Sequence, residues 1–304
     1  MPDTRELELL IRRDDLQSVQ WTPAQVTAQA EHTLVTDEVL LRVDRYALTT
    51  NNITYARMGQ ALRYWDFFPA ADGWGRMPVW GYADVVASRA PAVEVGTRCY
   101  GYLPMSTHVK LLVTDPSAHG FFDGSEQRRG LPRVYQRYLR SQLPTIVAED
   151  ARSLFQPLFG TGFLIDNWLR EQAQFGARQV LIASASSKTA LATAFLLSKR
   201  AQRDYEVIGL TSPRNHRFCA RVGYYDRVLD YDALRELPAT TPSLLIDMSG
   251  SSKVLRSVHQ YFGAALQRSC LVGSTHGSPD ALTSSVIAGA SADQAVVALP
   301  GPKP

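Results

Sequence analysis

The sequence predicts an α/β protein in which a β-rich N-terminal part precedes a doubly wound parallel sheet. Three observations lead to this fold class. The first third of the chain alternates apolar and polar residues between Gly- and Pro-containing turns, as β-strands do. A short uncharged apolar run then begins at Gln179 and passes through small polar residues into an Ala/Leu-rich segment with helical spacing. Strand and helix patterns continue to alternate as far as Ser274.

In the β-rich part, the clearest strand patterns lie within residues 38–46, 78–88 and 95–102. Residues 48–59 are expected to form a polar loop in which amides, hydroxyls and one tyrosine lie close together. The segment 63–69 follows and is unusually rich in aromatic residues. This third of the chain is therefore predicted to be all-β.

The segment from Ser125 to Gln142 is basic and aromatic. Charge runs of this kind commonly form a solvated surface. The alternative is a cationic rim that attracts a phosphorylated substrate carrier. The residues concerned are Arg128, Arg129, Arg133, Arg137 and Arg140, with Tyr135 and Tyr138 among them.

The second half of the chain is predicted to alternate strands with helices. A helix is expected over residues 155–170, with Thr161 near its start, and another over 216–222 that Gly223 closes. This alternation favours a parallel sheet with helices on both faces. After the strand that begins at Gln179, the predicted strands are 205–212, 227–231, 243–250 and 269–274.

The turn after the first of these strands is a candidate phosphate-binding site. Its backbone N–H groups and the dipole of the following helix would favour a pyrophosphate. Ser184, Ser186, Ser187 and Thr189 add hydroxyl groups, and Lys188 adds a cation. The three glycine positions of the G-x-G-x-x-G fingerprint hold no glycine, so serines replace glycines in this interpretation. An ordinary strand-to-helix turn is the alternative.

The end of the second strand indicates which nucleotide the sheet would bind. A ribose 2′-hydroxyl is normally held there by Asp or Glu, whereas a 2′-phosphate needs hydroxyls and cations. The turn reads Ser212-Pro213-Arg214-Asn215 and contains no carboxylate. Arg214 could hold a phosphate through two N–H groups. The alternative is that Arg214 only occupies a solvated turn.

Composition limits the remaining classes of function. The 304 residues are enough for two domains, because single cores stop growing at roughly 250–300 residues. The net charge of +3 is too small to imply nucleic acid or an anionic membrane as a partner. The charged N-terminus does not resemble a signal peptide, and no apolar run approaches the ~20 residues of a membrane span. We therefore expect a cytoplasmic protein.

Metal chemistry has no support in the sequence. Cys99, Cys219 and Cys270 are scattered, and the six histidines are dispersed. They form neither a disulfide framework nor the ligand spacing of a zinc site. We expect no metal.

The chain resembles the medium-chain dehydrogenase/reductase superfamily, on its zinc-free quinone and enone reductase side. More narrowly, it is similar to a group of quinone-reductase-like proteins known mainly as a domain of unknown function. The narrow similarity covers nearly the whole chain and rests on residues 50–56, 63–69, 78–81 and 100–105. The resemblance implies a GroES-like β-barrel domain and a Rossmann domain, with NADPH and substrate in the cleft between them.

The resemblance also implies a division of the chain. Residues 1–160 would form the GroES-like substrate and catalytic domain, 161–290 the Rossmann NADPH-binding domain, and 291–304 a tail. Related chains continue beyond this point into a further strand and helix, so we expect the tail to be truncated or disordered. The further strand commonly pairs across a dimer in the superfamily, so a homodimer is one assembly that the resemblance implies.

Several positions match the family's cofactor site. Thr161 falls near the nicotinamide, the serine-rich turn falls at the pyrophosphate, and Asn215 falls where relatives often carry lysine beside the 2′-phosphate. Candidates at the ends of the fourth and fifth strands complete the set. The cofactor-binding residues implied are Thr161, Ser184, Ser186, Ser187, Lys188, Thr189, Ser212, Arg214, Asn215, Ser249, Gly250 and Gly273.

Hydride transfer is the chemistry that this combination favours, because the cofactor reacts and the protein aligns it. Hydrogen-bond donors would stabilise the charge that develops on the substrate oxygen. Tyr55 could donate through its hydroxyl and Asn51 or Asn52 through an amide, with Tyr64 as a further candidate. The alternative is that the two asparagines cap the loop and that Tyr55 packs among aromatics.

The function expected is therefore a zinc-independent, NADPH-dependent reduction of a quinone, an enone or an enoyl thioester, the last delivered on a carrier. A different class of function stays open. The same fold could bind NADPH without catalysis, as a redox sensor or as a partner subunit of a biosynthetic complex.

Overall fold

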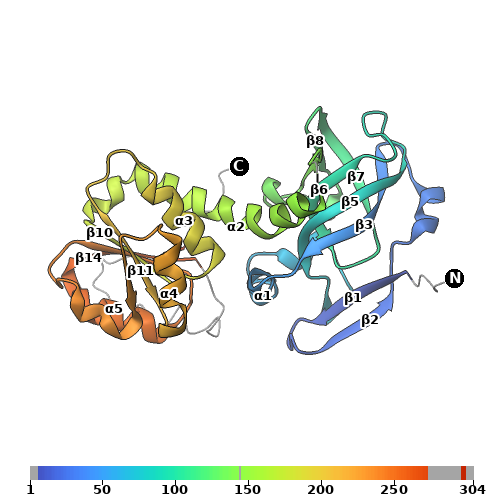
Figure 1. Ribbon diagram of the computed structural model, residues 1–304. Coiled ribbons are helices and arrows are strands. Elements are labelled where there is room, and N and C mark those ends of the chain that lie inside the picture. The colour runs from blue at the N-terminus through green and yellow to red at the C-terminus, as the bar shows by residue number, and fades with distance from the viewer. Residues whose placement is uncertain (1–5, 144, 273–295, 299–304) are drawn as a thin grey trace. The chain divides into compact units, whose positions relative to one another are not determined.

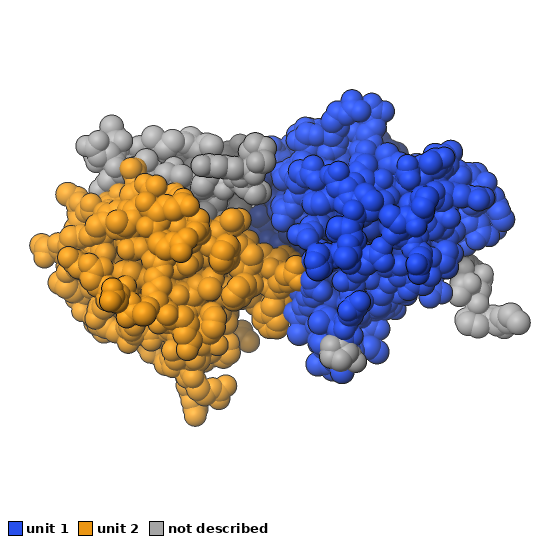
Figure 2. Space-filling view, turned by 90° about the horizontal axis from the view of Figure 1, so that it is seen from above, with its two compact units in different colours: residues 1–154, 302–304 blue, residues 155–301 orange. Residues whose placement is uncertain are grey.

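The computed structural model describes residues 6–143, 145–272 and 296–298 of the chain. The chain divides into two compact units, and the boundary between them falls between Leu154 and Phe155. Figure 1 labels their helices and strands, and Figure 2 colours the two units separately. Each unit has its own hydrophobic core, one cluster in the first and two in the second.

Unit 1 is built on a closed barrel of six antiparallel strands in the order β3-β5-β6-β9-β8-β7. β7 pairs back with β3, which closes the barrel and leaves no strand edge unpaired along this circuit. The β-barrel that the family resemblance implies is thereby confirmed. The strands are β3 (Glu38–Ala47), β5 (Pro78–Ser88), β6 (Arg98–Pro104), β7 (His108–Ser117), β8 (Gly120–Asp123) and β9 (Arg137–Arg140).

A small antiparallel sheet accompanies the barrel, with strand order β2-β1-β4. Its strands are β1 (Leu7–Arg12), β2 (Val19–Pro23) and β4 (Trp74–Gly75). The guanidinium of Arg76 donates two hydrogen bonds to the Glu8 carboxylate, of 2.8 and 2.7 Å, and both side chains are buried. A bidentate pair of this kind fixes the geometry of both partners. It therefore ties β1 to the chain that follows β4.

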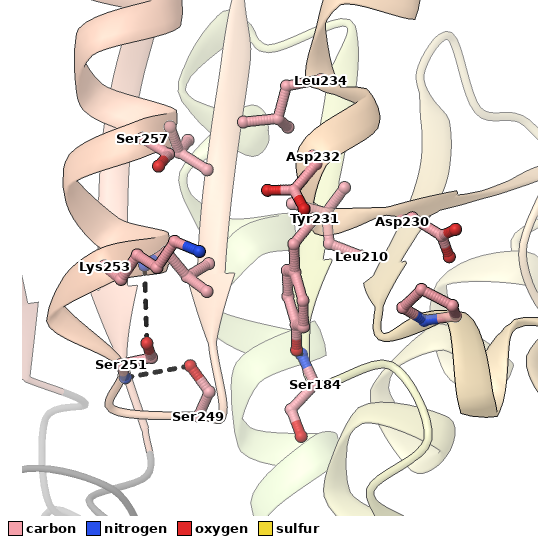
Figure 3. A pocket seen from close by; sticks show the side chains of 13 residues that line it. Ser184, Leu210, Asp230, Tyr231, Asp232, Leu234, Ser249, Ser251, Lys253 and Ser257 are labelled. Carbon is pink, nitrogen blue, oxygen red and sulfur yellow. Dashed lines mark hydrogen bonds between the residues drawn. The ribbon is translucent and has the colours of Figure 1, made fainter.

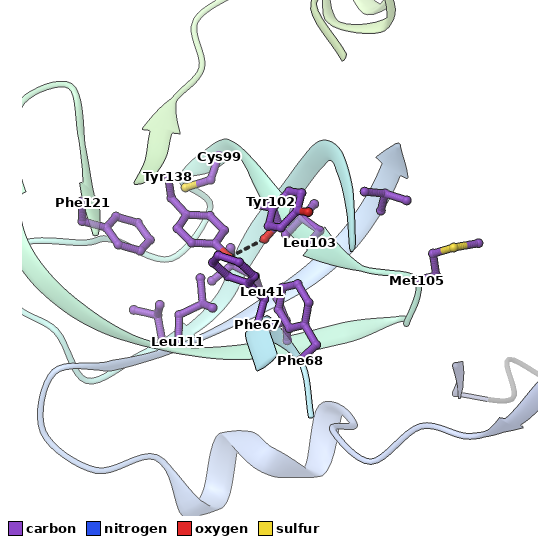
Figure 4. Packing of buried hydrophobic residues seen from close by; sticks show 14 of the residues in the cluster. Leu41, Phe67, Phe68, Cys99, Tyr102, Leu103, Met105, Leu111, Phe121 and Tyr138 are labelled. Atoms are coloured by element: carbon purple, nitrogen blue, oxygen red, sulfur yellow. Dashed lines mark hydrogen bonds between the residues drawn. The ribbon is translucent and has the colours of Figure 1, made fainter. Parts of the chain in front are cut away.

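The core of the barrel is rich in aromatic side chains (Figure 4). It also contains the buried cation Arg128. The Tyr138 hydroxyl donates a 2.6 Å hydrogen bond to the Tyr102 carbonyl. Arg128 is 1% exposed, with its guanidinium 4.6 Å from the centre of the Phe68 ring and 2.8 Å from the buried Asp123 carboxylate. A buried charge is tolerated when it is paired in this way.

The basic segment 125–142 is therefore not a uniform surface. Arg128 lies inside the barrel, which contradicts both the solvated surface and the cationic rim for that residue. Arg133 forms an exposed ion pair with Asp115 at 2.7 Å, and Arg140 donates to the Ala92 carbonyl. These arginines are engaged with their own unit.

Helix α2 (Ile146–Glu171) passes through the point where the two units divide. In unit 1, Arg98 holds its first turn to the barrel through two hydrogen bonds to the Glu149 carboxylate, of 2.7 and 2.6 Å. The sequence prediction placed the start of this helix nine residues too late. Pro157 lies inside the helix, and Thr161 lies in its middle rather than near its start. The Thr161 hydroxyl donates to the Pro157 carbonyl at 3.2 Å.

Unit 2 contains a six-stranded parallel sheet in the order β12-β11-β10-β13-β14-β15. Numbered from β10, this order is 3-2-1-4-5-6, that of a doubly wound dinucleotide-binding fold. The predicted sheet is confirmed. Its strands are β10 (Gln179–Ala183), β11 (Glu206–Thr211), β12 (Arg227–Asp230), β13 (Ser243–Asp247), β14 (Leu266–Leu271) and β15 (Val296–Ala298), and its helices include α3 (Lys188–Ser198), α4 (Pro213–Val222) and α5 (Ser252–Phe262).

Both faces of this sheet are covered by helices (Figure 1). Val180 and Ile182 pack with residues of α2 and α3 in one cluster. Leu181 and Ala183, which alternate with them along β10, pack with residues of α5 in the other. Gly162 allows α2 to approach α3 closely, because a Cβ there would lie 3.0 Å from the Thr193 backbone nitrogen.

One further sequence expectation needs correction. The polar loop expected at 48–59 is largely helix α1 (Thr50–Arg57), because Thr49 and Asn52 form a capping box that begins a helix. The predicted tail contains strand β15, which pairs in parallel with β14. Among the described residues, no helix is both long enough and apolar enough to cross a membrane.

The buried ion pair should contribute strongly to the stability of unit 1. Changing Asp123→Asn keeps the shape of the side chain but leaves the Arg128 charge buried and unpaired, so we expect a loss of about 3–5 kcal/mol in the free energy of unfolding. Asp115→Asn is the matched control, since it breaks the exposed pair with Arg133 and should cost less than about 1 kcal/mol. Chemical denaturation measures both, and equal losses would contradict the assignment.

Candidate nucleotide-binding site

The candidate site lies where the strand order of the unit 2 sheet reverses. β10 and β13 are neighbours in the sheet, and their following helices, α3 and α5, pack on opposite faces. In open α/β sheets, the crevice beyond the carboxyl ends of two such strands is the usual ligand site. Three turns converge on this edge, after β10, β11 and β13.

The turn after β10 begins with a strained residue. Ser184 has φ +58°, a left-handed conformation in which glycine is usual. Its backbone N–H donates a 3.0 Å hydrogen bond to the Tyr231 hydroxyl, and the next N–H, of Ala185, donates to the Leu210 carbonyl at 3.0 Å. The turn is therefore held by the two neighbouring segments, although no glycine is present.

The same turn leads into the N-terminus of α3. Ser187 is the N-cap, and its hydroxyl accepts a hydrogen bond from the Ala190 N–H. The N–H groups of Lys188 and Thr189, the first two helical residues, have no acceptor within the helix. The Lys188 side chain is exposed. These donors and this cation are the features that an anion requires at a helix N-terminus.

The turn after β11 lies beside the first one. The Asn215 side-chain amide donates a 3.0 Å hydrogen bond to the Ser186 hydroxyl, which joins the two turns directly. Ser212 is the N-cap of α4, and its hydroxyl makes no capping bond. Arg214 is exposed and forms no hydrogen bond or ion pair with another described residue. It is therefore available to a ligand.

The turn after β11 contains no carboxylate, but the carboxylate of Asp230 lies near it. Asp230, the last residue of β12, lies 3.0 Å from Nδ1 of His216 on α4, measured from its Oδ1. Sequence reasoning examined only the end of the second strand and did not consider the end of the third. The parallel pairing of β11 with β12 places both strand ends at the same edge.

The turn after β13 is organised by a buried carboxylate. Asp247 accepts hydrogen bonds from the Ser249 N–H (2.9 Å), the Ser249 hydroxyl (2.6 Å) and the Gly250 N–H (3.1 Å). Gly250 has φ +65°, so a glycine suits the position. Ser249 and Gly250 thus lie at the predicted edge, whereas Gly273 lies outside the described residues.

A cavity of about 330 Å³ opens among these turns (Figure 3). Its walls combine apolar side chains from the sheet, the 3₁₀ helix η6 (Tyr231–Glu236) and α5 with hydroxyls, two carboxylates and one ammonium group. Ligand pockets usually span roughly 300–1,000 Å³, so this cavity suits part of a dinucleotide rather than the whole. It is lined by Ser184, Leu210, Pro213, Asp230, Tyr231, Asp232, Leu234, Ser249, Ser251, Lys253, Val254, Ser257 and Val258.

The lining residues that the sequence analysis did not predict include Asp230, Tyr231 and Lys253. Figure 3 shows the Tyr231 hydroxyl directed at the backbone of Ser184. The signal that could have found the first two is their place directly after the third strand, where parallel topology brings side chains to the ligand edge. Lys253 lies in the first turn of α5 and had no comparable signal.

The predicted catalytic residues all belong to unit 1. Both polar atoms of the Asn52 side chain form hydrogen bonds within unit 1. Its Oδ1 accepts from the Thr49 N–H at 2.7 Å, and its Nδ2 donates to the Pro78 carbonyl at 3.0 Å. Asn51 is half-buried in the first turn of α1. The Tyr55 hydroxyl accepts a 3.1 Å hydrogen bond from the indole N–H of Trp80.

Tyr55 and Tyr64 are brought together in an aromatic cluster. Their ring centres are 4.7 Å apart, and the Tyr64 hydroxyl lies 3.3 Å from that of Tyr135. Burial raises the pKa of the Tyr55 hydroxyl and that of Tyr64 above the ordinary tyrosine value. Both groups therefore stay protonated at neutral pH and can act as hydrogen-bond donors but not as bases.

A family model described as "Protein of unknown function (DUF2855)" matches residues 46–298. The chain belongs to the DUF2855 family. Its sequence matches no protein in the curated set.

Solved structures share the two-unit fold at low sequence identity. The quinone oxidoreductase from Coxiella burnetii has a TM-score of 0.53 and 16% identity, over 97% of this chain and 83% of that one. CurK enoyl reductase has a TM-score of 0.56 and 13% identity, over 97% and 81%. CurA from Vibrio vulnificus has a TM-score of 0.58 and 14% identity, over 93% and 77%. At these identities the likeness establishes the fold alone.

The left-handed backbone of Ser184 predicts that a glycine substitution there stabilises unit 2. Ser184→Gly should raise the free energy of unfolding of unit 2 by about 1 kcal/mol, because a non-glycine residue pays roughly that cost at positive φ. Ser186→Gly is the control: its φ is not positive, and the change removes the hydroxyl that Asn215 contacts, so stability should fall by about 1 kcal/mol. Thermal unfolding of both variants measures the difference, and a loss in both would contradict the strained turn.

Proposed function

We propose that this protein is an oxidoreductase that binds NADPH in unit 2 and reduces a quinone, an enone or an enoyl thioester by hydride transfer. The observation that carries the proposal is the set of hydrogen-bond donors left without acceptors where the strand order reverses. They are the first N–H groups of α3 and the side chain of Arg214, which pairs with no other described residue. The fold shared with structures named as quinone oxidoreductase and enoyl reductase supports it.

The residues present fit a phosphorylated dinucleotide. The N-terminus of α3, with Ser186 and Lys188, would hold the pyrophosphate. Ser212 and Arg214, with Asn215 beside them, would hold the 2′-phosphate, because guanidinium binds phosphate through two parallel N–H groups. The mixed apolar and hydroxyl lining of the cavity suits the adenosine portion. Gly250 and Ser249 would border the cofactor at the end of β13.

The reduced nicotinamide supplies the hydride when it is bound, and the protein supplies position and hydrogen bonds. Reduction of a conjugated carbonyl compound places negative charge on its oxygen. We propose Tyr55 as the donor to that oxygen, with Asn51 and Tyr64 as the neighbouring donors. Asn52 supports this group by capping α1. The proposal needs no metal, and no cluster of three potential ligands occurs among the described residues.

A non-catalytic NADPH-binding protein, acting as a sensor or a partner subunit, is the second candidate. One observation favours it: the Tyr55 side chain is only 5% exposed, and its hydroxyl already accepts a hydrogen bond from Trp80. Consumption of NADPH with quinones or enoyl thioesters distinguishes the two candidates, because a sensor would bind the cofactor without turnover.

Arg214→Ala should weaken NADPH binding by about 1.5–3 kcal/mol, the usual loss of a charge-assisted hydrogen bond, and should leave NADH binding nearly unchanged. Arg217→Ala is a matched control, because Arg217 is another exposed arginine of α4 that lies one turn further along. Fluorescence titration with both nucleotides measures the effects. Equal losses for NADPH and NADH would remove Arg214 from the phosphate site.

Tyr55→Phe removes the proposed donor and keeps the ring. With a quinone such as 9,10-phenanthrenequinone as acceptor, we expect kcat and kcat/KM to fall together by about 10²–10³, with NADPH affinity unchanged. Tyr46→Phe, at a more exposed tyrosine of the same unit, should leave the kinetics unaltered. Unchanged turnover in the Tyr55 variant would assign that residue to packing.

A further inference from the structure

Tyr102 carries a buried hydroxyl group for which the described part of the protein supplies no partner. The side chain is 0% exposed, and its hydroxyl forms no hydrogen bond with any described residue. The backbone of Tyr102 is fixed in β6, where its carbonyl accepts from the Tyr138 hydroxyl (Figure 4). Because an unpaired polar group is unfavourable in the interior of a protein, a hydroxyl retained at such a place calls for a reason.

The ring of Tyr102 belongs to the aromatic cluster that contains the proposed donor Tyr55. Its ring centre lies 5.6 Å from that of Tyr55, 5.0 Å from that of Trp80 and 4.9 Å from that of Tyr135. Trp80 and Tyr135 are half-buried, so the cluster reaches solvent at these two rings. Tyr135 ends the short 3₁₀ helix η4 (Arg133–Tyr135). Side-chain rotamer changes are common on binding, and movement of the Tyr135 ring would open the cluster beside Tyr102.

The cluster holds phenolic protons for more than one acceptor oxygen. The Trp80 indole donates to the Tyr55 hydroxyl oxygen, and this bond does not use the Tyr55 proton. Burial raises the pKa of the Tyr102 hydroxyl well above the ordinary tyrosine value, so this group is also protonated at neutral pH. A quinone has two carbonyl oxygens on one flat ring, whereas an enone or an enoyl thioester has one. Two donors among aromatic rings therefore match a quinone.

Two arginines of the short helices that border the cluster already have anionic partners. Arg63 is the N-cap of η2 (Tyr64–Phe67) and pairs with Asp66 at 2.8 Å. Arg133 lies in η4 and pairs with Asp115 at 2.7 Å. A thioester carried on coenzyme A or on a carrier protein brings phosphate groups, which bind best where cations are unpaired. The local charge therefore favours an uncharged acceptor.

We propose that Tyr102 is a second hydrogen-bond donor to the acceptor and that the acceptor is a quinone. The inference rests on the proposed function. Tyr55 donates to one carbonyl oxygen and Tyr102 to the other, while the aromatic side chains pack against the flat ring. In the reaction, the quinone gains a hydride and one proton and becomes a hydroquinone. The proton comes from solvent, so neither tyrosine is left deprotonated.

The test compares two fused-ring ketones that bind without NADPH present. Quenching of tryptophan fluorescence gives the dissociation constants of 9,10-phenanthrenequinone, which has two carbonyl groups, and of fluorenone, which has one. Tyr102→Phe should weaken binding of the quinone about three- to tenfold, the usual effect of losing one hydrogen bond, and leave fluorenone binding nearly unchanged. Fluorenone is unaffected because its single oxygen uses Tyr55.

Tyr82→Phe is the matched control. The Tyr82 hydroxyl is also buried and without a partner among the described residues, but its ring packs on Tyr100, at 5.2 Å between ring centres, on the same β5–β6 pair. Removing it should leave the binding of both ketones unchanged. Each of the two variants loses a buried unpaired hydroxyl, so we expect each to raise the Tm by about 2–4 °C.

Each outcome decides the inference. Unchanged quinone binding in the Tyr102 variant, or equal losses for the two ketones, would overturn it and leave the proposed function intact. A Tm that falls in the Tyr102 variant and rises in the Tyr82 variant would also overturn it, because the Tyr102 hydroxyl would then have a structural partner such as water. If no quinone supports consumption of NADPH by the unaltered protein, the proposed function fails and the inference fails with it.

Discussion

The hydrogen bond from the Ser184 backbone to the Tyr231 hydroxyl is the contact on which the candidate site depends. It joins the turn after β10 to the segment after β12, although β11 lies between these two strands in the sheet. The left-handed backbone of Ser184 is unfavourable on its own, so neighbouring structure has to hold it. Tyr231 supplies that restraint and at the same time forms one wall of the cavity. A tyrosine thus takes over part of the role that glycine plays in the usual dinucleotide turn.

This substitution has a consequence for the chemistry of the turn. The Ser184 N–H is already satisfied, so an incoming phosphate would rely on the α3 N-terminus and on side-chain hydroxyls. The Ser186 hydroxyl is shared with Asn215, and the Ser187 hydroxyl is occupied in capping. Cations therefore matter more in this site than in a glycine-rich one. Lys188, at the start of α3, and Arg214, in the first turn of α4, are both exposed.

The sequence predicted those elements whose apolar residues recur at the spacing of a strand or of a helix. Strands β3, β5 and β6 of the barrel and β10 to β14 of the parallel sheet follow from alternation and from apolar runs. Strands β7, β8 and β9 of the barrel were not predicted. Helix α1 was missed because its capping box, Thr49 with Asn52, uses an asparagine where Glu or Gln is usual. The start of α2 was misplaced because Pro157 reads as a helix boundary, yet the helix continues through it. The burial of Arg128 had no local signal, since its partner Asp123 and its aromatic neighbours meet only when the barrel closes.

The hydrogen bond from the Asn215 amide to the Ser186 hydroxyl couples the turn after β11 to the turn after β10. A change at either residue leaves the other without its partner, so substitutions at the two positions should be accepted together rather than separately. Transplanting a glycine fingerprint into the turn after β10 would remove the Ser186 hydroxyl and release the Asn215 amide. An engineer who wished to convert this turn to the common form would therefore have to redesign the start of α4 in the same step.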